Sequence, residues 1–333
     1  MSVNEVAAGR ICFPAAVVGL GRIGQGYDYD VSVGAGPVLT HANAFASHSG
    51  FDLVAGVDPS AAERARFELK FGVPAFDSIE AMQRHVNPSV VALCVPTANH
   101  MEALELLLQK PLRAVLCEKP IAATYAEAKR MTACAKRADC VLLVNYMRRF
   151  EPGVLALKQA LAEGCCGDLY KGVVWYSKGF LNNASHFVDL LRFLLGEVGE
   201  IELIHAGRVW AGVDPEPDVR IRFGDCDVHF LAAREECFSL ACVELVGTGG
   251  FVHYLDSGER IEMRQVVPDP DYPGYLKLSD TARQVATDFR RYQWWVAEHL
   301  YRHLVDGTAL YSDGETASQT LETVERVLNL TKG

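Results

Sequence analysis

The chain has 333 residues, of which half are hydrophobic and 22% are charged, and it carries a net charge of −10. This composition is that of a globular protein with room for two domains, and the acidic balance argues against a nucleic-acid partner or an anionic membrane surface. No apolar run approaches the ~20 residues of a membrane helix. The N-terminus lacks a signal-peptide pattern, so we expect a cytoplasmic protein.

The ten cysteines show no CxxC pair and no zinc-ligand spacing, and several lie inside apolar, strand-like runs. Cysteines used in this way are typical of reduced, buried thiols in an intracellular protein. We therefore expect neither disulfides nor a metal site.

The first 150 residues alternate apolar strand-like runs with helix-like segments. Strands are expected in FPAAVVGLG, FDLVAGVD, SVVALCVP, RAVLCEKP and VLLVNYM, with helices in SAAERARFELKFG, ANHMEALELLLQ and TYAEAKRMTACAKR. The first of these helices should be capped by Ser60 and closed by Gly72. Strands that are apolar throughout and alternate with helices predict a parallel sheet covered on both faces. We expect residues 1–150 to form a doubly wound, Rossmann-type dinucleotide-binding domain.

Beyond residue 150 the pattern changes. A helix at PGVLALKQALAEG, a strand at DLYKGVVWYSKG and an amphipathic helix around SHFVDLLRFLLG precede a strand-rich region, residues 201–266. Helices are expected again in DTARQVATDFRRYQWWVAEHLYRHL and DGETASQTLETVERVL. Partial alternation of polar and apolar residues predicts mostly antiparallel strands. Residues 151–333 should therefore form an α+β domain with one large open sheet.

A glycine motif, GLGRIG, follows the first strand and places Gly19, Gly21 and Gly24 in the pattern G-x-G-x-x-G. The first glycine permits a tight turn, the second lets the backbone approach a pyrophosphate, and the third allows close helix–strand packing. Asp58 ends the second strand, where a carboxylate binds ribose hydroxyls and repels a 2′-phosphate. We therefore expect NAD rather than NADP, although Arg64 and Arg66 lie nearby in sequence.

Asp58 follows Gly24 by 34 residues, whereas the usual spacing is about 20. The excess falls in residues 25–40, whose glycines and Pro37 cannot continue a helix. Two interpretations stay open for this insertion: a surface loop, or a lid over the cofactor or the substrate.

Four further motifs follow in chain order: VALCVPTANH (91–100), CEKPIA (117–122), NYMRRFEP (145–152) and an H-x-x-D-x-x-x-x-L-x-G pattern that begins at His186. Together with GLGRIG they resemble the glucose–fructose oxidoreductase/inositol dehydrogenase/rhizopine-catabolism (Gfo/Idh/MocA) family over nearly the whole chain. The resemblance implies a nicotinamide-dependent oxidoreductase that acts on a secondary alcohol or ketone of a sugar, cyclitol or sugar derivative. It also implies a homodimer or homotetramer.

The resemblance gives Lys119 a place beside the nicotinamide, where it polarises the reacting oxygen, and makes His186 the proton relay. It also implies a cis peptide at Pro120. Elementary chemistry agrees, because a neutral imidazole accepts a hydroxyl proton and an ammonium stabilises a developing alkoxide. From their places in the motifs, the expected cofactor-binding residues are Gly19, Gly21, Arg22, Ile23, Gly24, Asp58, Pro96, Thr97, His100, Glu118 and Lys119, and the expected substrate-binding residues are Asn145, Arg148 and Asn182.

One residue departs from the family pattern. Asn182 stands four residues before His186, where the family usually has aspartate. An amide can orient a substrate hydroxyl but cannot carry a proton. Asn182 therefore either positions substrate beside a working Lys119 and His186, or marks a site that binds without turnover. The second case corresponds to an NAD(P)-sensing regulatory protein, and a linear-tetrapyrrole reductase shares the same architecture. Asp189 is expected to support His186.

Overall fold

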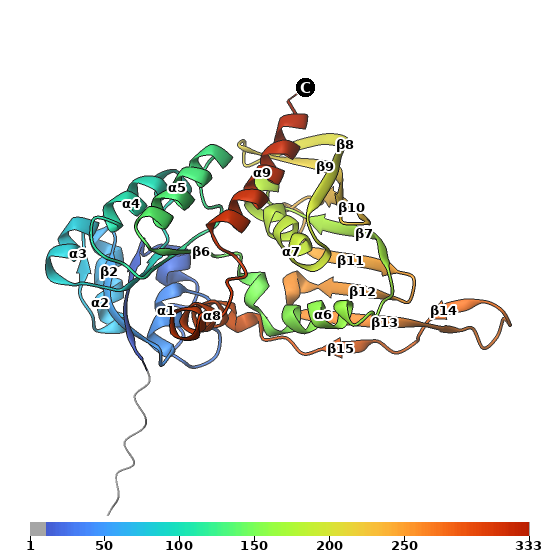
Figure 1. The fold of residues 1–333 in the computed structure, drawn as a ribbon, viewed down its shortest axis with the longest axis horizontal. Helices are drawn as coiled ribbons and strands as arrows, with labels where there is room; N and C mark the ends of the chain where they lie inside the picture. Colours follow the sequence, from blue (N-terminus) through green and yellow to red (C-terminus); the bar gives the residue numbers. More distant parts are fainter. Residues whose placement is uncertain (1–10, 333) are drawn as a thin grey trace, which may run out of the picture. The chain divides into compact units, whose positions relative to one another are not determined.

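The computed structural model describes residues 11–332, which form two compact units (Figure 1). The first unit takes in the chain up to Ala122 together with Arg130–Asn145 and Arg290–Gly314. The second unit takes in Ala123–Lys129, Tyr146–Phe289 and the chain from Glu315 on. None of the helices within residues 11–332 has the length and hydropathy of a membrane span. Residues 1–10 lie outside the described residues, and with them much of the N-terminus that we expected to lack a signal peptide.

The first unit is built on a six-stranded parallel sheet in the order β3-β2-β1-β4-β5-β6. Its strands are β1 (Phe13–Val18), β2 (Phe51–Val57), β3 (Ala75–Phe76), β4 (Val90–Leu93), β5 (Ala114–Cys117) and β6 (Val141–Val144). This is the strand order of the doubly wound dinucleotide-binding fold. Every residue of β4 and β5 is buried, which explains why these strands read as unbroken apolar runs. The predicted Rossmann sheet is confirmed.

Helices of this unit begin and end at the residues that local chemistry favours. They are α1 (His41–Ser47), α2 (Ala61–Phe71), α3 (Ile79–His85), α4 (His100–Leu107), most of α5 (Tyr125–Arg137) and α8 (Tyr292–Asp306). The hydroxyl of Ser60 accepts a hydrogen bond from the amide of Glu63, and Gly72 ends α2 in the left-handed conformation. Both were expected from the sequence, because a serine N-cap and a glycine C-cap satisfy the free backbone groups of a helix.

The second unit contains a nine-stranded sheet in the order β14-β13-β12-β11-β7-β10-β9-β8, with β15 also paired to β13. Its strands are β7 (Leu169–Tyr176), β8 (Val198–Trp210), β9 (Asp214–Phe223), β10 (Cys226–Ala232), β11 (Cys242–Gly247), β12 (Gly250–Leu255), β13 (Arg260–Pro268), β14 (Leu276–Leu278) and β15 (Arg283–Val285). Only β7 and β10 pair in parallel; the other pairs are antiparallel. The predicted large, mostly antiparallel sheet is confirmed.

Along β10 and β12 buried residues alternate with partly buried ones, so that one face of this sheet is more deeply covered than the other. The covering helices are α6 (Pro152–Ala162), α7 (Ser185–Leu195) and α9 (Gly314–Leu330), which lie on one side of the strands in Figure 1. Nine residues of α7 are buried. The helix that carries His186 is therefore part of the core of the second unit.

One expected helix begins later than its sequence indicates. The helix predicted from Asp280 begins only at Tyr292, and Arg283–Val285 forms β15, paired with Ile261–Met263 of β13. The antiparallel pairing supplies the backbone hydrogen bonds that a helix would otherwise have provided, so tertiary context overrides local propensity.

Candidate functional site

The glycine turn after β1 has the geometry that a dinucleotide requires. Gly19 has a φ of +94°, and a Cβ there would lie 2.6 Å from the carbonyl carbon of Cys94. A Cβ on Gly24 would lie 2.0 Å from the carbonyl oxygen of Gly19, whereas a Cβ on Gly21 would meet nothing within 4 Å. Close packing therefore requires glycine at positions 19 and 24. At Gly21 the backbone faces open space, where a pyrophosphate could approach it.

A cavity of about 660 Å³ lies beside this turn, lined by Gly19, Gly21, Asp58, Asp77, Ser78 and apolar residues that include Val95 and Pro96. The Asp58 carboxylate accepts hydrogen bonds from the amides of Leu20 and Ser60, both at 2.8 Å. Arg64 donates to the carbonyl oxygens of Asp58 and Pro59. The volume, the apolar walls and the fixed carboxylate fit the adenosine half of a dinucleotide.

The two residues between the second and third glycines, Arg22 and Ile23, begin a single π-helical turn, Arg22–Gly26. An α-helix begins at His41. No α-helix runs through the insertion, because Gly34 and Gly36 adopt positive φ and Pro37 has no amide hydrogen to donate. Arg22 is exposed and Ile23 is partly buried, so both stay predicted cofactor contacts.

Asp28 anchors the insertion to the first unit. Its buried carboxylate accepts hydrogen bonds from the amide of Leu39 (2.7 Å), from the amide and hydroxyl of Thr40 (3.2 and 2.6 Å), and from the side-chain amide of Asn43 (2.9 Å). The carbonyl oxygen of Asp28 accepts a further hydrogen bond from Lys70. The insertion is thus fixed to α1 and α2 along one side.

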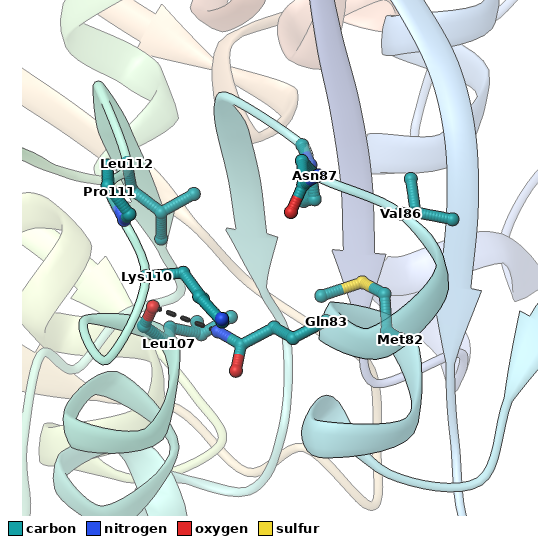
Figure 2. Close-up of a pocket in the computed structure, with 9 residues that line it drawn as sticks. Met82, Gln83, Val86, Asn87, Leu107, Lys110, Pro111 and Leu112 are labelled. Carbon is teal, nitrogen blue, oxygen red and sulfur yellow. Dashed lines mark hydrogen bonds between the residues drawn. The ribbon is translucent and has the colours of Figure 1, made fainter.

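A second hollow in the first unit, of about 220 Å³, lies between α3 and α4 (Figure 2). Gln83 crosses it and donates to the carbonyl oxygens of Leu106 and Leu107 at 3.2 and 3.0 Å. Its walls include Pro88 and Leu112, which lie two residues before β4 and β5 begin. Ligands of doubly wound sheets bind at the carboxyl ends of the strands, so this hollow at the amino ends is not the dinucleotide site.

Glu118 and Lys119 follow β5 at the carboxyl edge of the sheet, and the Lys119–Pro120 peptide is cis, as the resemblance implies. The Glu118 carboxylate contacts Nε2 of His41 at 2.7 Å and accepts a hydrogen bond from Asn145 at 2.6 Å. Burial by itself raises the pKa of Glu118, but these hydrogen bonds outweigh it and hold that pKa below its usual value. An ionised, anchored Glu118 thus fixes the turn that carries Lys119.

His100 connects two loops at the same edge. Its ring nitrogens lie 3.0 Å from the carbonyl oxygens of Ile121 and Val95, and its side chain is buried. Pro96 and Thr97 begin the short 3₁₀ turn between β4 and α4, where both remain accessible. The position of His100 indicates that it supports the neighbouring loops, while Pro96 and Thr97 stay open to a ligand.

In the second unit, a π-helical turn at Phe180–Ala184 leads into α7. The carboxylate of Asp214, from β9, accepts hydrogen bonds from the amides of Leu181 (3.0 Å) and Asn182 (2.8 Å). The amide of Gly179 donates to Glu216 at 3.1 Å. Burial raises the pKa of Asp214, and the backbone amides partly oppose that shift. Two buried carboxylates thus hold the turn from beneath.

The two asparagines of this turn bind backbone carbonyls as well. The side-chain amide of Asn182 donates to the carbonyl oxygen of Lys178 at 3.0 Å, and that of Asn183 donates to Ser177 at 2.8 Å. His186 lies in the first turn of α7, largely buried, with its ring edge-on to Tyr146 at 6.0 Å between centroids. Asn182 remains exposed, so its side chain stays accessible to a substrate.

Arg148 and Arg149 play different parts in the second unit. The guanidinium of Arg148 packs over the rings of Phe187 and Phe289, and its buried Nε and Nη1 have no hydrogen-bond partner within residues 11–332. Arg149 instead forms a buried, bidentate pair with Asp189, at 2.6 and 2.9 Å. The Nε and Nη1 groups of Arg148 can thus donate hydrogen bonds to a further oxygen atom, whereas Arg149 is bound to a buried core residue.

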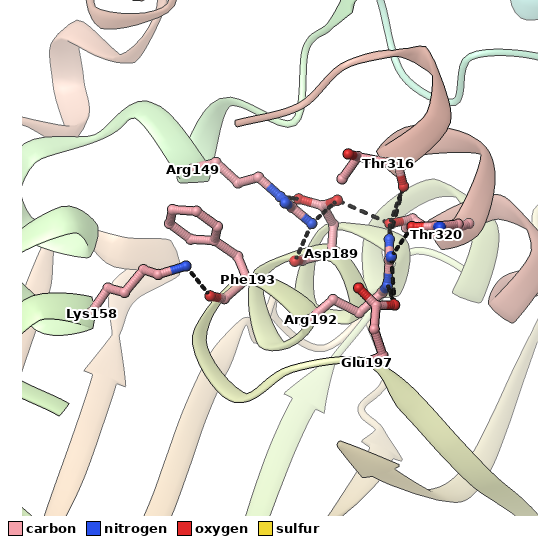
Figure 3. A network of polar contacts seen from close by, with 9 residues as sticks. Arg149, Lys158, Asp189, Arg192, Phe193, Glu197, Thr316 and Thr320 are labelled. Carbon is pink, nitrogen blue, oxygen red and sulfur yellow. Dashed lines mark hydrogen bonds and ion pairs between the residues drawn. The ribbon is translucent and has the colours of Figure 1, made fainter. Parts of the chain in front are cut away.

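Asp189 belongs to a polar network between α7 and α9 (Figure 3). Besides Arg149, it accepts a hydrogen bond from the hydroxyl of Thr320 at 2.9 Å. Arg192 binds Thr320, the carbonyl oxygen of Thr316 and Glu197 in the same network. Asp189 thus acts on the position of α7, and through that helix on the backbone of His186.

Residues 13–146 match the family described as an oxidoreductase family with an NAD-binding Rossmann fold, GFO_IDH_MocA. This part of the chain is thus similar to the Gfo/Idh/MocA family. The match confirms the resemblance inferred from the motifs and the NAD-binding class of the fold.

Curated relatives extend the likeness beyond the Gfo/Idh/MocA nucleotide-binding region. The inositol 2-dehydrogenase of Rhizobium meliloti is 30% identical over 200 residues, which are 54% of this chain and 54% of that protein. The trans-1,2-dihydrobenzene-1,2-diol dehydrogenase of Oryctolagus cuniculus is 35% identical over 209 residues, 57% of this chain and 63% of that protein. The chain thus covers between half and two thirds of the length of these relatives. They are named dehydrogenases, which supports an oxidoreductase.

The fold is shared over nearly the whole chain. The WlbA dehydrogenase from Bordetella pertussis, solved in complex with NADH and UDP-GlcNAcA, superimposes with a TM-score of 0.74 at 20% identity, and the alignment covers 97% of both chains. At that identity the likeness shows that the two chains share a fold over both units.

Three functional neighbours of the Gfo/Idh/MocA motifs escaped the sequence analysis. His41, Asp28 and Asp214 anchor Glu118, the insertion and the Asn182 turn, respectively. The hydrogen bonds through which they do so join residues that lie 12 to 77 positions apart in the chain. No spacing rule joins such distant residues; only His41 had a local signal, as the first residue of a helix next to the glycine motif.

Proposed function

We propose that the chain is an NAD(H)-dependent oxidoreductase that moves a hydride between the nicotinamide and a secondary alcohol or ketone of a sugar, cyclitol or related cyclic compound. The bare backbone at Gly21, beside the Asp58 cavity, carries this proposal, because it fits a pyrophosphate and a ribose. The fixed Asp58 carboxylate, together with Arg64 bound to backbone carbonyls, favours NAD over NADP.

NAD, when bound, supplies the hydride acceptor. Lys119 holds a positive charge that polarises the reacting oxygen, and His186 takes its proton. Asn182 and Asn145 orient the substrate. The buried side-chain oxygen of Asn145 has no hydrogen-bond partner among residues 11–332, so it can accept a hydrogen bond from a substrate hydroxyl. Arg148 offers its unpartnered guanidinium donors to a further substrate oxygen.

Names of the relatives narrow the substrate class. An inositol and a dihydrobenzene-diol are both cyclic compounds whose reacting hydroxyl has a hydroxyl neighbour. In this proposal residues 1–150 bind the cofactor. Residues 151–333 bind substrate together with Asn145 and Arg148, and they form the contacts of a homodimer or homotetramer. Light scattering of the purified chain measures the assembly.

The test is a panel of inositols, glycosides and cyclic trans-diols, read by nicotinamide absorbance, with NAD affinity measured separately by calorimetry. At least one compound should be oxidised, and Lys119→Ala should lower kcat at least about 1,000-fold. Lys129→Ala, a surface lysine paired with Glu315, is the matched control and should leave kcat unchanged.

Three outcomes would contradict the proposal. Full activity in Lys119→Ala removes the assigned mechanism. Tight NAD binding with no turnover across the panel supports an NAD(P)-sensing regulatory protein instead. Turnover of a linear tetrapyrrole alone supports a reductase of that class.

A further inference from the structure

Three sulfur side chains meet in the second unit, and none is a predicted site residue. The Sγ atom of Cys165 lies 3.6 Å from Sγ of Cys166 and 3.6 Å from Sδ of Met263. The two cysteines follow α6 in a tight turn that includes Gly164 and Gly167, both at positive φ, and Met263 comes from β13. Residues nearly a hundred positions apart thus bring two thiols and a thioether together.

The surrounding backbone fixes this cluster. The carbonyl oxygen of Cys166 accepts a hydrogen bond from the amide of Gly249 at 2.8 Å. A Cβ on Gly250 would lie 3.2 Å from Sγ of Cys166, so a larger residue there would press on the thiol. Cys166 and Met263 are 1% and 4% exposed. The two buried sulfurs are therefore held in place by the fold.

Cys165 provides access from outside. It is only partly buried, and with Met263 it lines a cavity of about 410 Å³ that also takes in Gln265 and Ser279. Two of the three sulfur-bearing side chains thus line one cavity, beside the buried Cys166.

We propose that Cys165, Cys166 and Met263 form a binding site for a monovalent copper ion. Thiolate and thioether sulfurs are the soft ligands that Cu(I) prefers. With metal–sulfur bonds of about 2.3 Å, three sulfurs around one ion lie ~4 Å apart, close to the two measured spacings. Binding replaces the two S–H protons, which pass to solvent, with two copper–thiolate bonds; the thioether donates a lone pair, and no oxidation state changes.

The donor set argues against other metals. A structural zinc site takes four thiolate, imidazole or carboxylate ligands. Within residues 11–332, no group of three or more histidines, cysteines, aspartates or glutamates is arranged to hold a metal ion. A thioether in third place therefore selects a softer, monovalent ion of low coordination number.

Anaerobic titration of the reduced full chain with Cu(I), in competition with a chromogenic Cu(I) chelator, tests the site. One tightly held copper per chain is expected, with near-ultraviolet absorption from thiolate bonded to copper. Cys165→Ser should weaken binding at least about 100-fold. Met263→Leu, which keeps the volume and the buried character but removes the sulfur, should weaken it about 10-fold. Cys237→Ser, which alters an exposed thiol elsewhere, should leave the affinity unchanged.

Two results overturn the proposal. Copper affinity that is equal in the parent chain, Cys165→Ser and Met263→Leu places any bound copper elsewhere. A parent chain that retains no copper, but loses two hydrogens between Cys165 and Cys166 on mild oxidation, shows a thiol pair that forms a disulfide in place of a metal site. Circular dichroism of each variant establishes that it is folded, and Met263→Leu tests the proposal without altering either thiol.

Discussion

At the scale of single residues, the most informative position is Asn182. The Gfo/Idh/MocA motif leads us to expect a carboxylate there, and the chain provides an amide. The structure places a different carboxylate against the same turn. The Asp214 side chain, from β9, accepts a hydrogen bond from the backbone amide of Asn182 itself. A Cβ on Gly179 would lie only 2.0 Å from this carboxylate, so the turn and Asp214 fit one another closely. Asp214 is thus a positioning residue for the segment that leads to His186.

Asp214→Asn should lower kcat about tenfold, an effect of ~1.4 kcal/mol on the barrier, while the KM for NAD stays unchanged. The substitution leaves one of the two backbone N–H groups facing an amide N–H₂ in place of an acceptor, so the turn shifts and His186 shifts with it. The measurement is steady-state kinetics on whichever substrate the panel identifies, and it rests on the proposed function.

Asp218→Asn is the matched control for this variant. Asp218 lies on the same strand, and its carboxylate accepts the amide of Ala232 rather than that of the turn. An equal loss of kcat in the two variants would show a general effect of altering β9. An unchanged kcat in Asp214→Asn would show that Asp214 does not position the turn.

At the scale of elements, the insertion of residues 25–40 shows how one buried carboxylate orders an irregular segment. Asp28 satisfies the amides of Leu39 and Thr40 and the side chain of Asn43. The hydroxyl of Thr40 in turn caps α1 by accepting the amide of Asn43. The insertion and the start of α1 are therefore one hydrogen-bonded element, although the sequence presents them as a loop followed by a helix.

Asp28→Ala should lower the free energy of unfolding by about 3 kcal/mol, because buried donors are left without an acceptor. Urea unfolding followed by circular dichroism measures the change. Asp30→Ala, an exposed acid two residues further on, should change stability by less than about 0.5 kcal/mol. If both variants unfold at the same urea concentration, Asp28 does not anchor the segment.

At the scale of the whole molecule, the first unit is completed by a helix from the far end of the chain. α8 comes after the whole second-unit sheet in sequence, yet it belongs to the first unit and packs on α1. Glu298 of α8 pairs with His48 at 2.9 Å, and the ring of Tyr301 lies 2.2 Å from where a Cβ on Gly50 would be. The glycine at position 50 is needed because this aromatic ring occupies the space.

A fragment of residues 1–150 should therefore be poorly stable, because the apolar surface under α8 would face water. The same fragment joined to residues 290–314 by a flexible glycine–serine linker should show a cooperative thermal transition and bind NAD. Calorimetric unfolding of the two fragments makes the comparison. A fragment of residues 1–150 that unfolds as cooperatively as the extended one would show that α8 is dispensable.

The sequence by itself determined the features that depend on neighbours along the chain. Periodicity gave the apolar strands of the first sheet, Ser60 and Gly72 gave the ends of α2, and GLGRIG gave the dinucleotide turn, since each signal lies within one element. Tertiary structure alone decided what joins distant segments: β15 in place of a helical turn, α8 in the first unit, His41 on Glu118, Asp214 beneath Asn182, and the sulfurs of Cys165 and Met263 in contact. The physical reason is that hydrogen bonds and packing act through space, and no spacing along the chain encodes which partners will meet.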